Sequence, residues 1–329
     1  MRKKYDVAAI GEFLIDFTYS GISENGRKLF EQNPGGAPVN MLTTVSHMGY
    51  RTAFIGKVGK DMHGDFLKQT LEKENICSDY LIQDGSVFTT LAFVEIDEKG
   101  ERSFSFARKP GADGCISFGE IDRQLLGDCK IFHFGSLSLA GEPARTATIE
   151  AVKAAKESGA VISYDPNYRP SLWKNEATAV RAIKSMMPYA DFMKVSEEES
   201  RLITGEANLQ RAADKILDAG IRLAAITLGG QGVFLACSGG SERVPAYEVT
   251  PVDTTGAGDS FWGGFLSKYL EFAQPPQNME WTAWKKCALY GNAAASLCVQ
   301  RRGGIPAIPT KKETDRRLQD LEKQYWKDI

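Results

Sequence analysis

The sequence has few of the side chains that bind metal ions or form disulfides. Its 329 residues include six cysteines, with no Cys-x-x-Cys pair, and three scattered histidines. These numbers support neither a zinc site nor a disulfide framework, so reduced thiols are the expected state. The formal net charge of −2 argues against a basic surface that binds nucleic acid.

Long apolar segments are also missing. No stretch is long and apolar enough to span a bilayer, so we expect no contact with a membrane. The apolar run near the N-terminus is interrupted by Asp6, Gly11, Glu12 and Asp16, and no small-residue cleavage site follows it. A signal peptide is therefore not predicted, and the expected location is cytoplasmic.

Two common phosphate-binding motifs are absent. No Gly-x-x-x-x-Gly-Lys-Ser/Thr occurs, which excludes a P-loop protein. Gly256 and Gly258 do not begin a dinucleotide-binding fingerprint either, because Phe261 occupies the position of the third glycine. Any phosphate chemistry must therefore use a different turn.

Such a turn is predicted at residues 253–259, Asp-Thr-Thr-Gly-Ala-Gly-Asp. An extended, strand-like segment at residues 242–250 precedes it, and apolar residues at helical spacing follow it, so a helix begins within the motif. Gly256, Ala257 and Gly258 let the backbone approach a ligand, and the N–H groups of the first helical turn favour an anion. Asp259 would be a general base beside this anion hole, a combination that suits phosphoryl transfer to a hydroxyl. The alternative is an ordinary acidic residue at a helix N-terminus.

Strands and helices alternate along most of the chain. Hydrophobic residues make up 43% of the sequence, which is ample for a large core. The alternation predicts one α/β domain over residues 1–329, with a doubly wound, mostly parallel sheet and helices on both faces. The expected strands are 7–10, 52–58, 80–82, 130–134, 160–165, 191–195, 223–228 and 233–236, and the expected helices are 38–47, 61–74, 143–157, 176–186, 197–204, 208–219, 257–272, 281–299 and 311–326.

A small second β-sheet is predicted from about residues 13–31 and 89–107. The second segment has the pattern of a hairpin, with strands at 89–97 and 101–107 joined by residues 97–100. Apolar and polar residues alternate strictly over 102–107, so one face of the hairpin contacts water or a partner. We expect this sheet to act as a lid and to join two copies of the chain in a homodimer.

Two motifs resemble the signatures of the ribokinase-like (PfkB) sugar kinases. Residues 253–259 resemble the second signature, and Gly35-Gly36-Ala37-Pro38-Val39-Asn40 resembles the first, in the family's order and separation. Further matches run from Gly11 to Pro309, so the resemblance covers nearly the whole chain. It implies a ribokinase-like fold and an enzyme that phosphorylates a small sugar with ATP and Mg²⁺, with K⁺ as a further candidate ion.

Residues 35–40, 109–113 and 302–309 resemble those of the fructokinase branch of this family. This resemblance implies transfer of the γ-phosphate of ATP to the 6-hydroxyl of D-fructose. Kinases for 2-keto-3-deoxygluconate, aminoimidazole riboside or ribose are the alternatives within the family. A catalytically silent, sugar-binding regulator is the alternative outside enzymes, although the intact Asp259 argues against it.

The resemblance also implies which residues bind the sugar. Asp16 would grip ring hydroxyls, although a solvated carboxylate is the simpler interpretation of this residue alone. Gly36 would allow close backbone approach, and the Asn40 amide can both donate to and accept from a hydroxyl, unless the pair only forms a helix-entry turn. Arg169 would contact the substrate or the transferred phosphate, or else lie on the surface in a turn.

The ATP and metal sites are likewise implied by the resemblance. Glu199 would organise Mg²⁺ through water, although Ser196 stands where many relatives have asparagine, and acidic residues here also suit a helix N-terminus. Lys194 would neutralise phosphate charge or be a surface lysine at a strand end. The carbonyls near Asp253 and Thr255 would bind a monovalent cation beside the bend at 301–306. The remaining nucleotide candidates are Thr227, Gly229 and Gly232 in a glycine-rich turn, which could be a simple hairpin, and Asn292 and Ser296 on an apolar helix, where close packing is the alternative.

Overall fold

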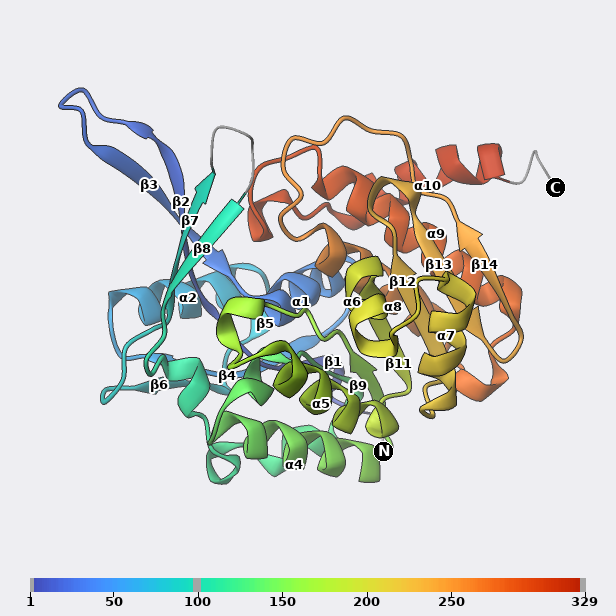
Figure 1. Ribbon diagram of the computed structural model, residues 1–329, viewed down its shortest axis with the longest axis horizontal. Helices are drawn as coiled ribbons and strands as arrows, with labels where there is room; N and C mark the ends of the chain where they lie inside the picture. Colours follow the sequence, from blue (N-terminus) through green and yellow to red (C-terminus); the bar gives the residue numbers. More distant parts are fainter. Residues whose placement is uncertain (1–2, 97–101, 326–329) are drawn as a thin grey trace.

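The computed structural model describes residues 3–96 and 102–325. Its larger part is a ten-stranded sheet with the order β14-β13-β12-β11-β10-β9-β1-β4-β5, in which β6 also pairs with β4 (Figure 1). Neighbouring strands run parallel from β5 to β12, and β13 and β14 are added antiparallel. The strands are β1 (Tyr5–Ile10), β4 (Thr52–Gly59), β5 (Ile76–Cys77), β6 (Leu81–Asp84), β9 (Cys129–Phe134), β10 (Val161–Tyr164), β11 (Phe192–Ser196), β12 (Leu223–Thr227), β13 (Val233–Cys237) and β14 (Gly240–Val244).

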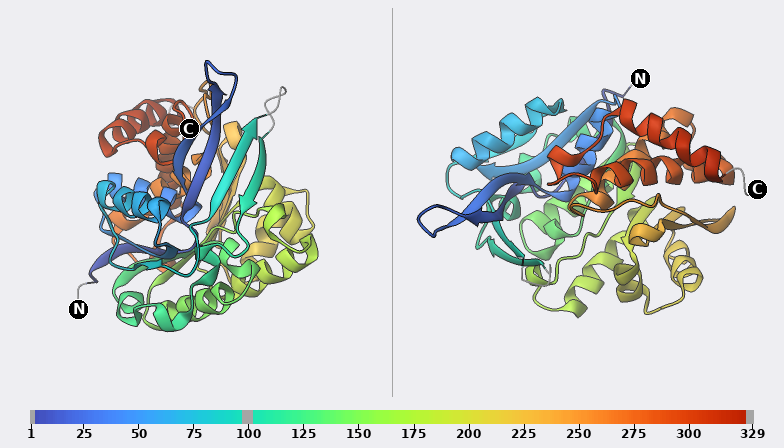
Figure 2. Two further views of the ribbon diagram at one scale, coloured as in Figure 1. Left: turned by 90° about the vertical axis from the view of Figure 1, so that its left-hand side faces the viewer. Right: turned by 90° about the horizontal axis from the view of Figure 1, so that it is seen from above.

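Helices cover both faces of this sheet, as the sequence predicts (Figure 2, right). One face packs against α3 (Arg123–Gly127), α4 (Ala144–Glu157), α5 (Glu176–Met186), α6 (Glu197–Thr204) and α7 (Leu209–Asp218). The other packs against α1 (Ala37–His47), α2 (Met62–Lys73), α8 (Ala257–Phe272) and α9 (Trp281–Cys298), with α10 (Lys311–Tyr325) against α9.

The central strand β1 shows why residues 7–10 form a continuous apolar run. All six of its residues are buried. Ala8 and Ile10 belong to the hydrophobic core on one face of the sheet, and Val7 and Ala9 belong to the core on the other. A parallel strand with both faces covered needs apolar side chains in both directions, which produces a run rather than an alternation.

Close contact between α8 and α9 fixes the helix that follows the 253–259 motif. A Cβ on Gly264 of α8 would lie 3.1 Å from the Cα of Gly291 in α9, so the two backbones approach at this point. Trp262 on α8 is fully buried, and its indole N–H donates to Ser163 Oγ at 2.8 Å. These contacts hold α8 firmly against the sheet, and they therefore fix the position of the motif at its N-terminus.

A separate four-stranded sheet rises from the edge of the main body (Figure 2, left). Its order is β3-β2-β7-β8, with β2 (Leu14–Ile22), β3 (Lys28–Gly35), β7 (Leu91–Ile96) and β8 (Arg102–Ala107). The predicted small sheet is thus confirmed. The first hairpin is longer than predicted, because β3 continues through Pro34 to Gly35 instead of ending at Glu31. The predicted turn at 97–100 lies outside the described residues.

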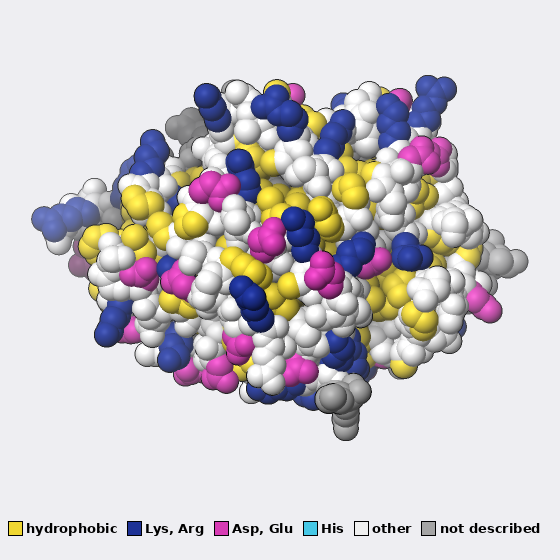
Figure 3. Space-filling model, turned by 90° about the horizontal axis from the view of Figure 1, so that it is seen from below, with side chains coloured by type: hydrophobic (Ala, Val, Ile, Leu, Met, Phe, Trp, Pro, Cys, Tyr) yellow, Lys and Arg dark blue, Asp and Glu magenta, His cyan; other side chains and the backbone are white. Residues whose placement is uncertain are grey.

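Some short elements were not predicted. These are α3 and β5. The extended segment predicted at 242–250 begins within β14, which ends at Val244. The strand predicted at 80–82 is β6, which pairs with β4 outside the main strand order. Within the described residues, no helix combines the length and the apolar character needed to cross a membrane. On the face of the molecule drawn in Figure 3, basic and acidic side chains are interspersed.

Candidate active site

A cavity of about 670 Å³ lies between the lid sheet and the carboxyl ends of the main strands. Ligands of open parallel sheets bind at this end of the strands. The cavity brings together ten of the residues predicted from the sequence: Asp16, Gly36, Asn40, Arg169, Lys194, Asp253, Thr255, Gly256, Gly258 and Asp259. Ala257 lies between two of them in the chain. Six others do not line it: Glu199, Thr227, Gly229, Gly232, Asn292 and Ser296.

Asp259 lies in the first turn of α8 and faces Asn40 of α1. The Asn40 Nδ2 group donates to Asp259 Oδ2 at 2.9 Å. Within the described residues, Asn40 Oδ1 is buried and has no hydrogen-bond partner. Burial raises the pKa of the Asp259 carboxyl above its ordinary value, whereas the nearby Lys194 ammonium and the Asn40 bond lower it. The pair therefore combines a carboxylate with elevated proton affinity and an unsatisfied acceptor beside it, an arrangement that can bind a hydroxyl.

The backbone at the start of α8 is set by Gly256. This residue has a left-handed conformation with φ of 75°, which favours glycine. A Cβ at this position would lie 3.3 Å from the Cα of Gly304 in the bend near the C-terminus. The Ala257 N–H donates to Thr254 O at 3.3 Å. N–H groups in the first turn of a helix have no partner within the helix, and the helix dipole favours an anion there.

Lys194 lies beneath this turn and not on the surface, so the surface alternative is wrong. Its side chain is 8% exposed, and its ammonium donates to Asp165 Oδ2 at 2.5 Å. A Cβ on Gly258 would lie 3.1 Å from Lys194 Nζ, so the ammonium rests against the backbone of α8. Asp165 was not singled out from the sequence, because its partner comes from a different strand.

The loop after β10 carries Arg169 into the cavity. Asp165 Oδ1 accepts the Asn167 N–H at 3.2 Å, and Asn167 itself has a positive φ of 46°. The Arg169 guanidinium donates to Tyr168 O at 3.2 Å. A tight turn, fixed by Asp165, thus positions the arginine.

Glu199 is engaged with backbone N–H groups. Its Oε1 accepts from Tyr168 N at 2.6 Å and its Oε2 from Ser196 N at 2.8 Å, while Ser196 Oγ accepts from Glu199 N at 3.1 Å. This reciprocal capping box joins Ser196 and Glu199 at the start of α6. No group of three or more His, Cys, Asp or Glu side chains within the described residues could hold a metal alone. Such a sparse donor set fits Mg²⁺, which keeps several waters and relies on substrate phosphates.

Asp253 joins the motif to the bend at residues 301–306. Its Oδ1 accepts the N–H and the hydroxyl of Thr255 at 2.8 and 2.7 Å, and its Oδ2 accepts the Gly303 N–H at 3.0 Å. The structure therefore brings together the two segments that the sequence assigned to a monovalent cation.

The predicted nucleotide residues have largely structural contacts. Gly232 needs to be glycine, because its φ is 95° and a Cβ would lie 2.2 Å from Val244 O. Asn292 donates to Val244 O and Pro245 O at 3.3 and 2.9 Å, and Ser296 donates to Ala293 O at 2.8 Å. Thr227 donates to Val195 O at 3.3 Å. Since the side-chain donors of Asn292 and Ser296 are bound to the backbone, their contacts favour the packing alternative.

The lid contributes cavity residues that the sequence did not reveal. Asp16 pairs across the strands with Asn33, and Thr18 pairs with Glu31, so these four side chains share one face of the lid. Phe106 of β8 also lines the cavity. Strand alternation would have identified Thr18, Glu31 and Asn33 if the register between β2 and β3 had been known.

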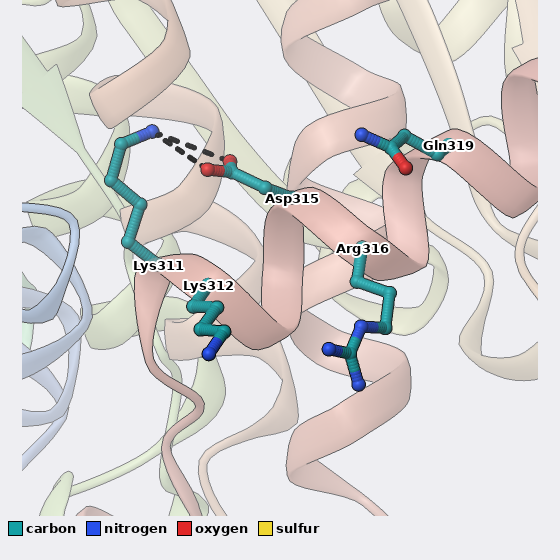
Figure 4. A pocket seen from close by; sticks show the side chains of 5 residues that line it. All are labelled: Lys311, Lys312, Asp315, Arg316 and Gln319. Atoms are coloured by element: carbon teal, nitrogen blue, oxygen red, sulfur yellow. Dashed lines mark hydrogen bonds and ion pairs between the residues drawn. The ribbon is translucent and has the colours of Figure 1, made fainter.

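A second hollow lies along α10 (Figure 4). Its five residues are Lys311, Lys312, Asp315, Arg316 and Gln319. All come from one helix, and the Lys311 ammonium is already paired with Asp315 at 3.1 Å. This open surface contains none of the predicted site residues, so it is not the candidate active site.

Comparison with known proteins defines the class of the chain. Residues 4–311 match the model of the pfkB family of carbohydrate kinases, and the chain belongs to this family.

Three relatives of the chain carry the name fructokinase. The chain is 37% identical over 321 residues to "Probable fructokinase-5" of Arabidopsis thaliana. The aligned residues cover 96% of this chain and 98% of that relative. The crystal structure of fructokinase with bound ATP from Xylella fastidiosa superposes with a TM-score of 0.88 at 28% identity, covering 96% of this chain and 99% of that one. A fructokinase double mutant from Vibrio cholerae O395, with fructose, ADP and potassium bound, gives a TM-score of 0.86 at 30% identity, covering 97% and 100%.

Proposed function

We propose that the protein is an ATP-dependent fructokinase that acts as one domain and transfers the γ-phosphate of ATP to the 6-hydroxyl of D-fructose. The observation that carries this proposal is the Asp259–Asn40 pair, at 2.9 Å, at the N-terminus of α8 in a cavity roofed by the lid. Family membership and the fructokinase relatives support both the reaction and the sugar.

In the proposed reaction Asp259 accepts the proton of the attacking hydroxyl. Asn40 orients that carboxylate, and its own unpaired Oδ1 accepts from another sugar hydroxyl. N–H groups of residues 256–259 stabilise the negative charge that develops on the transferred group, and Arg169 contacts the sugar or that group. Bound Mg²⁺ would bridge the ATP phosphates and neutralise part of their charge.

The sugar is held, in this proposal, between the lid and α1. A Cβ on Gly35 would lie 2.1 Å from Asp16 Oδ2, so the carboxylate of Asp16 rests directly on the glycine turn that begins α1. This contact supports a role for Asp16 in binding ring hydroxyls. A closed lid would exclude water and so protect ATP from hydrolysis.

Charge on the lid side of the cavity favours a neutral sugar. Asp16 and Glu31 both line this region. The carboxylate of 2-keto-3-deoxygluconate would be repelled by these side chains, which is a reason to prefer fructose over a sugar acid. Ribose and aminoimidazole riboside carry no such negative charge, so they stay open on this argument.

The nucleotide is proposed to contact Lys194, Thr227, Gly229 and Gly232, with Asn292 and Ser296 shaping the helix beside it. Glu199 would act on Mg²⁺ through water, with the lone pairs that its two backbone bonds leave free. The carbonyls near Asp253 and Thr255 would bind K⁺.

The test is ADP release with Mg-ATP and a panel of fructose, ribose, 2-keto-3-deoxygluconate and aminoimidazole riboside. Fastest turnover with fructose is expected. Fastest turnover with another member would keep the kinase and change its substrate. Measurable sugar binding without ADP release would support the silent regulator instead.

We also propose a homodimer formed through the lid. Phe93 contacts both Phe17 and Phe30 on the lid, with ring centroids 5.3 Å and 6.0 Å apart. Phe93 is 37% exposed and Leu29 is 48% exposed, so this aromatic surface is incompletely covered. Sedimentation at micromolar concentration is expected to give a dimer, and Phe93→Glu a monomer. A monomeric wild-type protein would refute the proposal.

The proposed location is the cytoplasm, where the six free cysteines would stay reduced. Cell fractionation tests this assignment directly.

A further inference from the structure

We propose that Asp165 is a positioning residue for phosphoryl transfer. By pairing with Lys194 it fixes the ammonium beneath the first turn of α8, where the positive charge favours ionised Asp259 without covering it. The inference rests on the proposed function, in which Asp259 accepts the proton of the sugar hydroxyl.

The pair is built by two neighbouring strands. Asp165 directly follows β10, Lys194 belongs to β11, and the parallel register places Tyr164 opposite Met193. The Nζ–Oδ2 distance is 2.5 Å, with side-chain exposures of 8% for Lys194 and 4% for Asp165. A buried ion pair is weak evidence for a role in stability, because desolvation offsets much of the attraction. The role of the Asp165–Lys194 pair must therefore come from where the pair lies.

The location is the backbone beneath the proposed base. The contact at Gly258, where a Cβ would lie 3.1 Å from Nζ, places the ammonium against the residue that precedes Asp259. The cavity surface also includes Lys194. An ammonium has three N–H donors, and the bond to Asp165 uses one of them. The cation can therefore act on the base and on an anion in the cavity while it stays anchored.

Several charges face Asp259 from the surrounding elements. They are Lys194 on β11 and Asp165 and Arg169 in the loop after β10. The Cys298 thiol on α9 is neutral, because burial raises its pKa to about 12, and α1 contributes the neutral Asn40. Burial acts to lower the pKa of Lys194, but Asp165, Asp259 and Glu199 together raise it above its ordinary value. Lys194 therefore stays charged at neutral pH, and Asp165 is the carboxylate that it contacts directly.

This arrangement predicts what the loss of Asp165 does. The ammonium would keep two carboxylates around it, Asp259 and Glu199. A shift toward Asp259 would form a direct ion pair and occupy the lone pairs that must accept the proton. Asp165 thus prevents the cation from blocking the base that it assists.

The experiment compares Asp165→Asn with Lys194→Met in profiles of kcat/KM against pH, whose acidic limb reports the pKa of the base. Lys194→Met is expected to move that limb to higher pH by about one unit, because a nearby cation is lost. Asp165→Asn is expected to move it to lower pH by about one unit and to reduce kcat by about 10- to 100-fold. The inference would be overturned if the acidic limbs of both variants stayed at the wild-type pH, or if both limbs moved in the same direction.

The double variant Asp165→Asn/Lys194→Met covers the case in which a buried, unpaired lysine prevents folding. It buries neither charge, and its kcat is expected to equal that of Lys194→Met within about threefold, because Asp165 acts through Lys194. A kcat that falls by the product of two independent effects would refute the inference.

A measurement without turnover separates this inference from the proposed function. The Asp259 carboxyl carbon can be titrated by NMR in the protein alone, with its signal assigned by its loss in Asp259→Asn. The pKa is expected to rise in Lys194→Met and fall in Asp165→Asn. A wild-type protein without kinase activity would overturn the proposed function, whereas an Asp259 pKa that ignores both changes would overturn the positioning role alone.

Discussion

Replacement of Asp259 by asparagine isolates its chemical role from its structural one. The two side chains have nearly the same shape, and the amide oxygen of asparagine can still accept from Asn40 Nδ2, which lies 2.9 Å from the native carboxylate. The change removes only the charge and the capacity to take a proton. Any large effect on turnover therefore reports on chemistry and not on repacking.

The expected loss in kcat is about 10²- to 10⁴-fold, the usual contribution of a general base, which corresponds to about 3 to 5 kcal/mol of transition-state stabilisation. The free energy of unfolding should not fall along with kcat. Burial raises the pKa of Asp259 in the folded protein, so the ionised carboxylate is less favourable there than in the unfolded chain. At neutral pH this charge costs stability, and the asparagine variant should unfold at the same temperature or a higher one.

The assay measures ADP release at saturating Mg-ATP and fructose, together with thermal unfolding of both proteins at pH 7. Turnover within a few-fold of wild type would remove Asp259 from the role of base. A clear drop in unfolding temperature would contradict the electrostatic reasoning, since it would mean that the ionised carboxylate stabilises the fold.

Three further changes test other parts of the molecule. Asp16→Ala should raise the KM for fructose with a smaller effect on kcat; steady-state kinetics with both values unchanged would exclude the contact. His47→Gln removes an ion pair with Glu74, with nitrogen and oxygen 2.8 Å apart, and this pair raises the pKa of the histidine. A raised pKa means that the stabilisation is complete below the unfolded-state value of about 6.5 and is lost as pH rises through the folded-state value, so unfolding scans should differ most at acidic pH. Gly291→Ala would place a Cβ 2.6 Å from a backbone carbonyl of α8 and should cost ~1–3 kcal/mol in denaturant unfolding, whereas Gly119→Ala, with open space around it, should be nearly neutral.

The main sheet could be predicted because its strands carry the signature of burial on two faces. The run 7–10 lies within β1, and the alternation of such runs with helices defines a parallel sheet. Short elements lack this signal. Strand β5 has only two residues, so it does not differ from a loop in sequence. The extension of β3 through Pro34 was missed because proline usually disfavours a strand, although β3 is an edge strand, where proline is tolerated.

Some residues of the candidate site could likewise be predicted from the sequence, whereas others could not. Residues within one contiguous motif, such as Gly256 and Asp259, could be found because their spacing alone defines a turn and a helix start. Contacts between distant segments could not be found in this way. The partner of Lys194 is 29 residues away along the chain, and the capture of Glu199 by the Tyr168 N–H depends on how a loop folds over α6.

In the proposed mechanism, the charges around α8 explain how an anion hole and a base can occupy the same helical turn. The first-turn N–H groups attract a phosphoryl group, but a carboxylate in that turn repels it and, when buried, tends to bind a proton. Lys194 opposes both effects, because a cation beneath Gly258 attracts the phosphoryl group and favours ionised Asp259. A free lysine would settle on the base itself. In this proposal the buried Asp165 removes that conflict, so a residue that touches no substrate would decide whether the base is available.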